Sequence, residues 1–177
     1  MPGQKFSSAP ILETERLRLR AHRATDHAGC LAIWSDPRVT RYIGGKPSSA
    51  EDVWQRVLRY AGLWSVLGYG YWVVEEKSTG QYVGDVGCAD FKRQMTPALD
   101  GMLEWGWAFA PRAHGKGYAT EALRAVMSWA QANLDAQRMV CILAPDNLAS
   151  IRVAEKAGFR LWQNTMYHGD PTVVFVR

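Results

Sequence analysis

Cysteine is scarce in this sequence, and the residue spacings of a metal or disulfide site are missing. The three cysteines, Cys30, Cys88 and Cys141, are far apart and odd in number, so they do not form a disulfide framework. Neither CxxC nor HxxxH spacing occurs, so we expect no bound metal. A reducing, cytoplasmic setting follows as the default expectation.

Long apolar runs are also missing. No stretch approaches the ~20 consecutive apolar residues that a membrane-spanning helix needs, and residues 1–12 hold no run long enough for a signal peptide. We therefore expect no membrane partner. Repeats, linkers and low-complexity segments are absent as well. The 177 residues predict one domain over residues 11–177, preceded by a loose tail at residues 1–10.

Concentrated charge is lacking too. The net charge is only +4, and the basic residues are mostly scattered. No zinc-finger spacing, basic helix or aromatic ribonucleoprotein pattern accompanies them, which argues against nucleic acid as a partner. Apolar residues make up 47% of the chain and charged residues 21%, the balance of an ordinary globular protein.

The apolar periodicity that is present predicts an α/β (α+β) domain. About seven strands, each a short apolar or alternating run, and about four helices with 3.6-residue periodicity follow one another in an order that forms a mixed central sheet with helices on its faces. The expected strands are residues 17–20, 71–75, 82–88, 103–110, 138–143, 159–166 and 172–176. The expected helix starts are Thr25, Ser48 with Glu51 as a capping box, Gly117, and Asp146 or Asn147.

A glycine-rich turn joins the strand at 103–110 to the helix that follows it. Gly115 and Gly117 let the backbone approach a ligand closely. The free N–H groups of the first helical turn and the positive end of the helix dipole then favour an anion such as a pyrophosphate. A Walker loop is excluded because GxxxxGK[ST] is absent, and a dinucleotide fingerprint lacks its third glycine, which is Thr120 here. A turn that merely connects two elements is the remaining alternative.

The sequence around this turn resembles the GCN5-related N-acetyltransferase (GNAT) family. His114-Gly-Lys-Gly117-Tyr-Ala119 is similar to the R/Q-x-x-G-x-G/A signature, with Pro111 before it and residues 120–123 matching after it. Residues 147–159 resemble the second motif of the family. Residues 13–19 and 36–45 resemble the branch of the ribosomal-protein N-terminal (Rim-type) acetyltransferases. The resemblance covers roughly residues 11–176 and implies acetyl-CoA as the cosubstrate, with no metal.

The resemblance also implies where the cofactor lies. In the family the fourth and fifth strands splay apart, and the pantetheine arm pairs with the fourth strand, here near Trp107, Ala108 and Phe109. His114 departs from the usual Arg or Gln and removes one phosphate contact, but backbone N–H groups still hold the pyrophosphate. The other expected cofactor residues are Arg112, His114, Gly115, Lys116, Gly117, Tyr118, Ala119, Thr120 and Asn147.

Two residues are candidates for proton transfer. Ser150 is the candidate acid for the departing thiolate that the resemblance implies, because Ala154 stands where many family members have the tyrosine acid, and the Rim-type branch uses a serine at the position of Ser150. A first-turn serine that only bonds locally is the alternative. Glu104 is the candidate base, since a partly buried carboxylate on the strand that carries the acyl group accepts an ammonium proton. A structural carboxylate that caps backbone or pairs with an arginine is its alternative.

The expected function is transfer of the acetyl group of acetyl-CoA to a primary amine, by direct attack in a ternary complex. The acceptor is either a protein N-terminus or a small molecule, and we expect it to meet residues 41–47, the helix from Ser48 and the loop at 92–100. A non-catalytic acyl-CoA sensor on the same fold is the main alternative, and a nucleotide-binding protein is a third. Monomer and homodimer both stay open.

Overall fold

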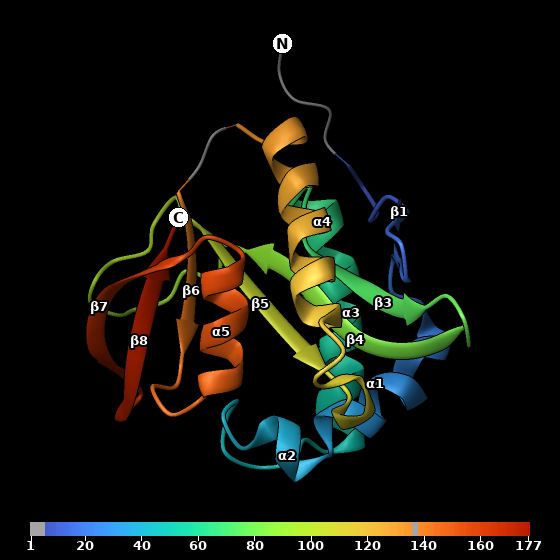
Figure 1. The fold of residues 1–177 in the computed structure, drawn as a ribbon, viewed down its shortest axis with the longest axis horizontal. Helices are drawn as coiled ribbons and strands as arrows, with labels where there is room; N and C mark the ends of the chain where they lie inside the picture. Colours follow the sequence, from blue (N-terminus) through green and yellow to red (C-terminus); the bar gives the residue numbers. More distant parts are fainter. Residues whose placement is uncertain (1–5, 136–137) are drawn as a thin grey trace.

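One mixed sheet of eight strands runs through the molecule, and helices cover both of its faces (Figure 1). The computed structural model describes residues 6–135 and 138–177. The strands are β1 (Leu12–Glu13), β2 (Leu17–Arg20), β3 (Tyr71–Glu76), β4 (Gln81–Ala89), β5 (Leu103–Phe109), β6 (Met139–Leu143), β7 (Arg160–Tyr167) and β8 (Asp170–Val176). Their order is β1-β2-β3-β4-β5-β6-β8-β7, and among these neighbours only β5 and β6 are parallel.

The helices follow the expected alternation. They are α1 (His27–Trp34), α2 (Pro37–Thr40), α3 (Ala50–Leu67), α4 (Tyr118–Asn133) and α5 (Leu148–Lys156), with 3-10 turns η1 (Ala24–Asp26) and η2 (Pro111–Ala113). The predicted mixed α/β class is therefore confirmed. One more strand and one more helix occur than expected, because β1 has only two residues and α2 only four, too few to show a periodicity.

Two predicted helix caps are wrong by one residue. The N-cap of α1 is Asp26, the last residue of η1, and not Thr25. In α3 the capping box is formed by Ser49 and Asp52, because the N–H of Ser48 donates to the carbonyl oxygen of Trp34 at 2.9 Å and holds Ser48 before the helix. Asn147 caps α5 as one of the two expected residues, and its Oδ1 accepts the N–H of Ser150.

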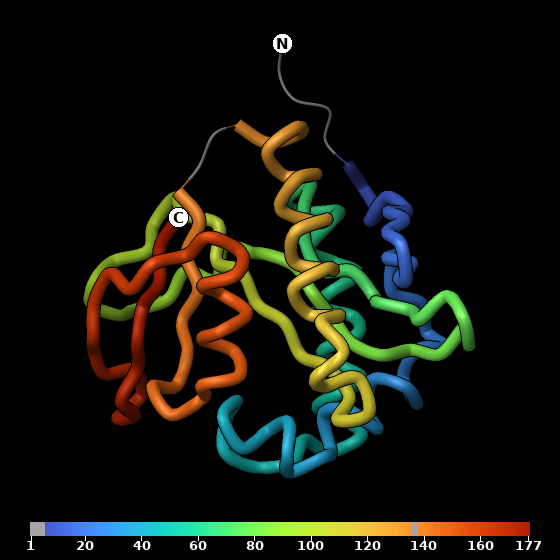
Figure 2. The backbone as a smooth tube through the Cα atoms, viewed as in Figure 1, coloured from blue at the N-terminus to red at the C-terminus, as the bar shows by residue number. Residues whose placement is uncertain are grey.

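Each face of the sheet has its own layer of helices. In Figure 1, α4 and α5 lie in front of the sheet and α3 behind it, and the tube in Figure 2 traces the same path. Trp105 and Phe109 of β5 pack in the main core with α4, whereas Ala108 packs with α1 and α3. The predicted alternation of faces along β5 is confirmed, and it places Glu104 on the α1–α3 side.

Tryptophans hold the large core together, and the N-terminal segment packs on them. The rings of Trp64, Trp72 and Trp129 meet edge to face, with centroids 4.5–5.3 Å apart. Phe6 packs on Trp129 at 5.1 Å, and the carbonyl oxygen of Pro10 accepts the Trp72 indole N–H at 2.8 Å. Residues 6–10 thus lie against the domain instead of forming a loose tail. Residues 1–5 of that expected tail lie outside the described residues, and the boundary at residue 11 stays a prediction.

Strands β5 and β6 separate soon after they meet. They pair only at Leu103 with Met139 and at Glu104 with Val140, and then diverge (Figures 1 and 2). This is the splay predicted between the fourth and fifth of the expected strands, counted without β1. Within residues 6–135 and 138–177, no helix is both long and apolar enough to cross a membrane.

Candidate functional site

The divergence of β5 and β6 leaves one edge of β5 without a strand partner. From Glu104 to Phe109, β5 pairs with β4 along its other edge, from Ala89 to Gly84. Because β6 pairs no further than Glu104, the backbone groups of the rest of β5 on that side meet no described strand. The predicted pantetheine contacts Trp107, Ala108 and Phe109 lie on this free stretch.

The glycine turn lies at the open end of the gap. Gly115 and Gly117 have φ of +75° and +79°, the left-handed region that favours glycine. A Cβ on Gly115 would meet nothing within 4 Å, so space lies in front of the backbone there.

The N-terminus of α4 is left uncapped. Gly117 is its N-cap and provides no side-chain hydrogen bond, whereas Ser49 and Asn147 cap α3 and α5. First-turn N–H groups without a side-chain acceptor are the donors that an anion binds. The predicted residues Tyr118, Ala119 and Thr120 form that first turn.

Arg16 fixes the glycine turn from the far end of the sequence. Its Nη1 donates to the Lys116 carbonyl oxygen at 2.8 Å, and its guanidinium pairs with Glu121 at 2.6 Å. The pairing raises the pKa of Arg16. Burial raises the pKa of Glu121, but hydrogen bonds from Thr14 and Arg16 outweigh it and lower that pKa. Lys116 itself lies 3.4 Å from Glu76. Arg16 was not among the predicted site residues, because no short motif links positions one hundred residues apart.

Two predicted cofactor side chains are turned back to the sheet. The His114 imidazole Nε2 lies 2.9 Å from the carbonyl oxygen of Phe109, and Arg112 donates to the carbonyl oxygen of Tyr82 at 2.5 Å. The backbone of the turn, rather than these side chains, therefore faces the open space. The cofactor roles of His114 and Arg112 stay predictions.

The start of α5 stands across the gap, after β6. The Asn147 side chain accepts the backbone N–H of Ser150 at 3.2 Å, so its capping role is observed. Ser150 is half-buried on the first turn, and no described residue hydrogen-bonds its hydroxyl. Ala154, where many family members have a tyrosine, is completely buried.

Glu104 lies where the gap begins and is ion-paired. It is 6% exposed, and both of its oxygens accept N–H groups of Arg93, at 2.5 and 2.7 Å. Burial raises the pKa of the Glu104 carboxyl, and Arg93 opposes that shift without cancelling it. Arg93 also donates to the hydroxyl of Tyr167 at 3.0 Å. Sequence reasoning allowed for an arginine partner but did not identify Arg93, which lies in the irregular segment between β4 and β5, or Tyr167, which ends β7 far along the chain.

A second buried polar cluster lies under α1. The carboxylate of Asp85 on β4 accepts the Trp34 indole N–H at 3.2 Å and the Tyr82 hydroxyl, and it lies 2.7 Å from the Nε2 of His22. Trp34 is therefore a buried core residue. The Arg56 guanidinium stacks on its ring at 3.5 Å.

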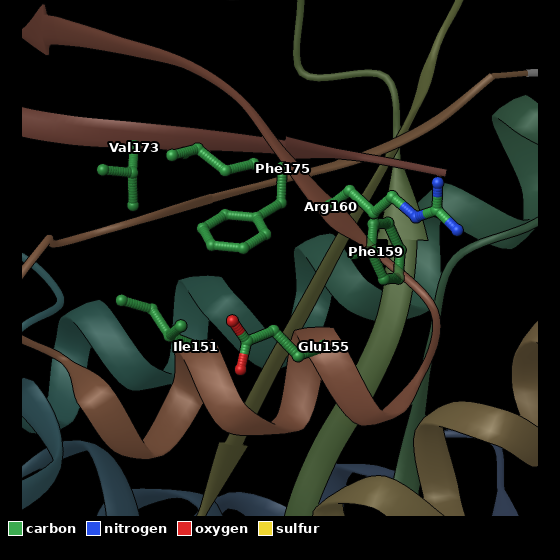
Figure 3. Close-up of a pocket in the computed structure, with 7 residues that line it drawn as sticks. Ile151, Glu155, Phe159, Arg160, Val173 and Phe175 are labelled. Atoms are coloured by element: carbon green, nitrogen blue, oxygen red, sulfur yellow. The ribbon is translucent and has the colours of Figure 1, made fainter.

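Two hollows accompany these elements. One, of about 610 Å³, follows α4 from Gly117 and Thr120 to Ser128 and is bordered by the cations of Arg16, Arg124 and Lys156. The other, of about 490 Å³, lies between α5 and strands β7 and β8 (Figure 3). Its lining is mostly apolar, and none of the predicted site residues contributes to it. Only the first hollow adjoins the glycine turn.

Comparison with known families and proteins agrees with this geometry. The family model described as "Acetyltransferase (GNAT) domain" matches residues 16–160. The uncharacterized N-acetyltransferase YoaA of Bacillus subtilis (strain 168) is 30% identical over 152 residues, which cover 85% of this chain and 83% of YoaA.

Solved structures share the whole fold. An acetyltransferase from Agrobacterium tumefaciens str. C58 superposes with a TM-score of 0.81 at 28% identity, covering 96% of this chain and 95% of that one. RimL, a ribosomal L7/L12 alpha-N-protein acetyltransferase solved with coenzyme A, superposes with a TM-score of 0.76 at 19% identity, covering 95% and 97%. At that identity, RimL shows likeness of fold alone.

Proposed function

This chain belongs to the GNAT acetyltransferase family, and from that premise we propose that it moves the acetyl group of acetyl-CoA onto a primary amine by direct attack in a ternary complex. The observation that carries the proposal is the free edge of β5 beside an uncapped helix N-terminus. The first offers backbone groups to an amide-containing arm, and the second offers N–H groups to a pyrophosphate. Both needs are met by coenzyme A.

The residues of the gap have distinct tasks in this reaction. The turn at Gly115–Gly117 and the first turn of α4 hold the phosphates, and β5 from Trp107 to Phe109 orients the pantetheine arm. Bound acetyl-CoA supplies the thioester. Glu104, directly or through water, takes a proton from the ammonium form of the acceptor, and the neutral amine forms the new C–N bond as the C–S bond breaks. The Ser150 hydroxyl gives a proton to the departing sulfur and regains the proton that the new amide nitrogen loses.

The acceptor in this proposal is a protein N-terminus or a small-molecule amine, and the enzyme works in the cytoplasm as a monomer or homodimer. The structural neighbour RimL, a ribosomal L7/L12 alpha-N-protein acetyltransferase, supports the first acceptor. The segment at residues 41–47, which follows α2, and the loop at 92–100 between β4 and β5 are the proposed acceptor side.

The test is an acetyl-CoA-consumption screen over amino acids, polyamines, aminoglycosides and N-terminal peptides, combined with thermal unfolding in the presence of coenzyme A. We expect coenzyme A to raise the melting temperature, since a ligand that binds only the native state stabilises it. At least one amine class is expected to turn over. Stabilisation without turnover of any amine would support the sensor, and stabilisation by NAD but not coenzyme A would support the nucleotide-binding alternative.

A further inference from the structure

Arg93 connects three separate parts of the chain around Glu104. It lies in the segment between β4 and β5, and its Nε and Nη2 donate to the two oxygens of Glu104. Its Nη1 donates to the hydroxyl of Tyr167 at the end of β7. The guanidinium also packs near the rings of Phe91, at 4.9 Å, and Tyr167, at 5.1 Å. Such a two-point contact fixes the orientation of a carboxylate as well as its charge.

The other titratable groups that face Glu104 give it no positive charge. Tyr71 approaches from β3, Asp90 from the end of β4 and Cys141 from β6. Burial raises the pKa values of Tyr71 and Cys141, so both are neutral at pH 7. Burial and Asp90 both raise the pKa of Glu104, and Arg93 alone among these neighbours lowers it.

We propose that Arg93 is a positioning residue for acetyl transfer, which keeps the buried Glu104 carboxylate ionised and aimed at the point where β5 and β6 separate. This inference rests on the proposed function, because it assigns Glu104 a proton to take. The contact with Arg93 leaves room for that proton, since two carboxylate oxygens offer about four lone-pair sites and Arg93 uses two. Glu104 is also the last residue of β5 that pairs with β6, so its carboxylate lies at the closed end of the gap.

Tyr167 connects Arg93 to the end of β7. Its hydroxyl holds the third nitrogen of the guanidinium, so the β7–β8 hairpin and the 90–102 segment meet at one cation. A lysine in place of Arg93 would keep the charge but lose the two-point contact. Arg93→Lys therefore separates charge from orientation, and Arg93→Gln removes both.

The first experiment needs no acceptor. Protein labelled with ¹³C at glutamate carboxyls is titrated by NMR as wild type, Arg93→Gln and Arg93→Lys, with Glu104→Gln used to assign the Glu104 signal. In Arg93→Gln we expect the Glu104 midpoint to rise by about one to three pH units, the range that a neighbouring opposite charge imposes. In Arg93→Lys the rise is smaller. Arg18→Gln, on β2 with two strands between it and β5, removes an exposed cation that pairs with Glu13, and as the control it leaves the midpoint unchanged.

The second experiment is the pH dependence of kcat/KM for the most active amine of the screen. The acid limb is expected to move upward in Arg93→Gln by the same amount as the NMR midpoint, with the rate recovering at higher pH. A folded Arg93→Gln or Arg93→Lys protein with an unchanged Glu104 midpoint overturns the inference while the proposed function stands. A wild type that binds coenzyme A but transfers acetyl to no amine overturns the proposed function, and the inference with it.

Discussion

The hydroxyl of Ser150 lies on the first turn of α5, across the gap from β5. Alanine at this position keeps helix propensity and nearly keeps volume, and the backbone N–H still donates to Asn147. We expect Ser150→Ala to bind coenzyme A as the wild type does but to transfer acetyl about ten- to a hundredfold more slowly, the lower range of a general-acid contribution. Calorimetry with coenzyme A and single-turnover rates measure the two quantities.

Ser65→Ala is the matched control for that variant, because Ser65 lies on the exposed side of α3 and, among the described residues, its hydroxyl donates only to the carbonyl oxygen of Ser7. Its rate is expected to match the wild type. A normal rate in Ser150→Ala would mean that water supplies the proton. Lost binding would instead make Ser150 a cofactor contact.

Glu104 gives a prediction with a definite pH sign. A base acts in its ionised form, and burial raises the pKa of this carboxyl, so activity increases as the pH rises through that raised pKa. Glu104→Gln is expected to lower kcat/KM about a hundredfold or more at neutral pH, and to recover partly at high pH, where the amine deprotonates unaided. Normal turnover per folded molecule, with only stability reduced, would assign Glu104 a purely structural role.

At single positions, the sequence predicted placement better than contacts. The placement of Glu104 and Ser150 beside the gap follows from the alternation of β5 and the start of α5, read together with the splay that the family resemblance implies. The partners Arg93 and Arg16 were not predicted, because their contacts depend on how distant loops fold over the sheet. The carbonyl contact of His114 could not be inferred either, since a side-chain rotamer leaves no trace in spacing.

Among the elements, α2 has a cap with a measurable pH signature. Arg38 and its backbone N–H lower the pKa of Asp36 from 3.8 to about 2. A carboxyl whose pKa is depressed in the folded state stabilises the fold above its unfolded pKa and loses that contribution as the pH falls through the folded value. We therefore expect the stability difference between wild type and Asp36→Asn to be constant above pH 3.8 and to shrink between 3.8 and about 2. Urea unfolding at a series of pH values measures it, and a difference independent of pH would contradict it.

The glycine turn offers a second test at this scale. Gly117→Val puts a β-branched side chain at φ +79°, in the turn proposed for the pyrophosphate, and Gly101→Val imposes similar strain at φ +72°, before β5. Both variants should lose about 1–3 kcal/mol of stability from backbone strain. Only Gly117→Val is expected to lose most of the stabilisation by coenzyme A, read as a thermal shift. If coenzyme A raised the melting temperature of both variants equally, the glycine turn would not be part of the proposed pyrophosphate site.

Long elements were predictable and short ones were not. The regular apolar stripes of α3 and α4 and the alternation of β5 identify these elements within one or two residues. β1 has two residues and α2 has four, about one period of a strand and of a helix, so no pattern repeats within either element. The one-residue errors at Thr25 and Ser48 have the same origin, because neighbouring polar residues offer equivalent caps and tertiary contacts select among them.

For the whole molecule, Asp85 joins the layer of α1 to the sheet. Its carboxylate accepts hydrogen bonds from Trp34 of α1 and Tyr82 of β4, and it contacts the imidazole of His22 before η1. Asp85→Ala would leave these buried groups without an acceptor and is expected to cost about 3–5 kcal/mol of unfolding free energy, as for a broken buried polar pair. Glu51→Ala, on the exposed first turn of α3, is the control, within about 0.5 kcal/mol of wild type. A small loss in Asp85→Ala would show that water replaces the carboxylate.

The overall architecture was predictable because strand and helix order, read together with the family resemblance, defines the sheet. The packing of residues 6–10 was not, since a short segment without periodicity gives no sign that Trp72 and Trp129 will receive it. The chemistry of the reaction was inferred at the level of the family, and the acceptor depends on loop surfaces that the motifs do not describe.

The gap between β5 and β6 has a mechanical consequence. Within the described sheet, β1–β5 and β6–β8 are joined only by the β5–β6 strand pair, which has two residue pairs, so the sheet consists of two halves connected by a short hinge. A ligand arm that hydrogen-bonds to the free edge of β5 and contacts the start of α5 connects the two halves of the sheet a second time. The bound substrate thus adds to the rigidity of the connection between the two halves. After each release of coenzyme A, the two residue pairs of β5 and β6 again form that connection within the sheet.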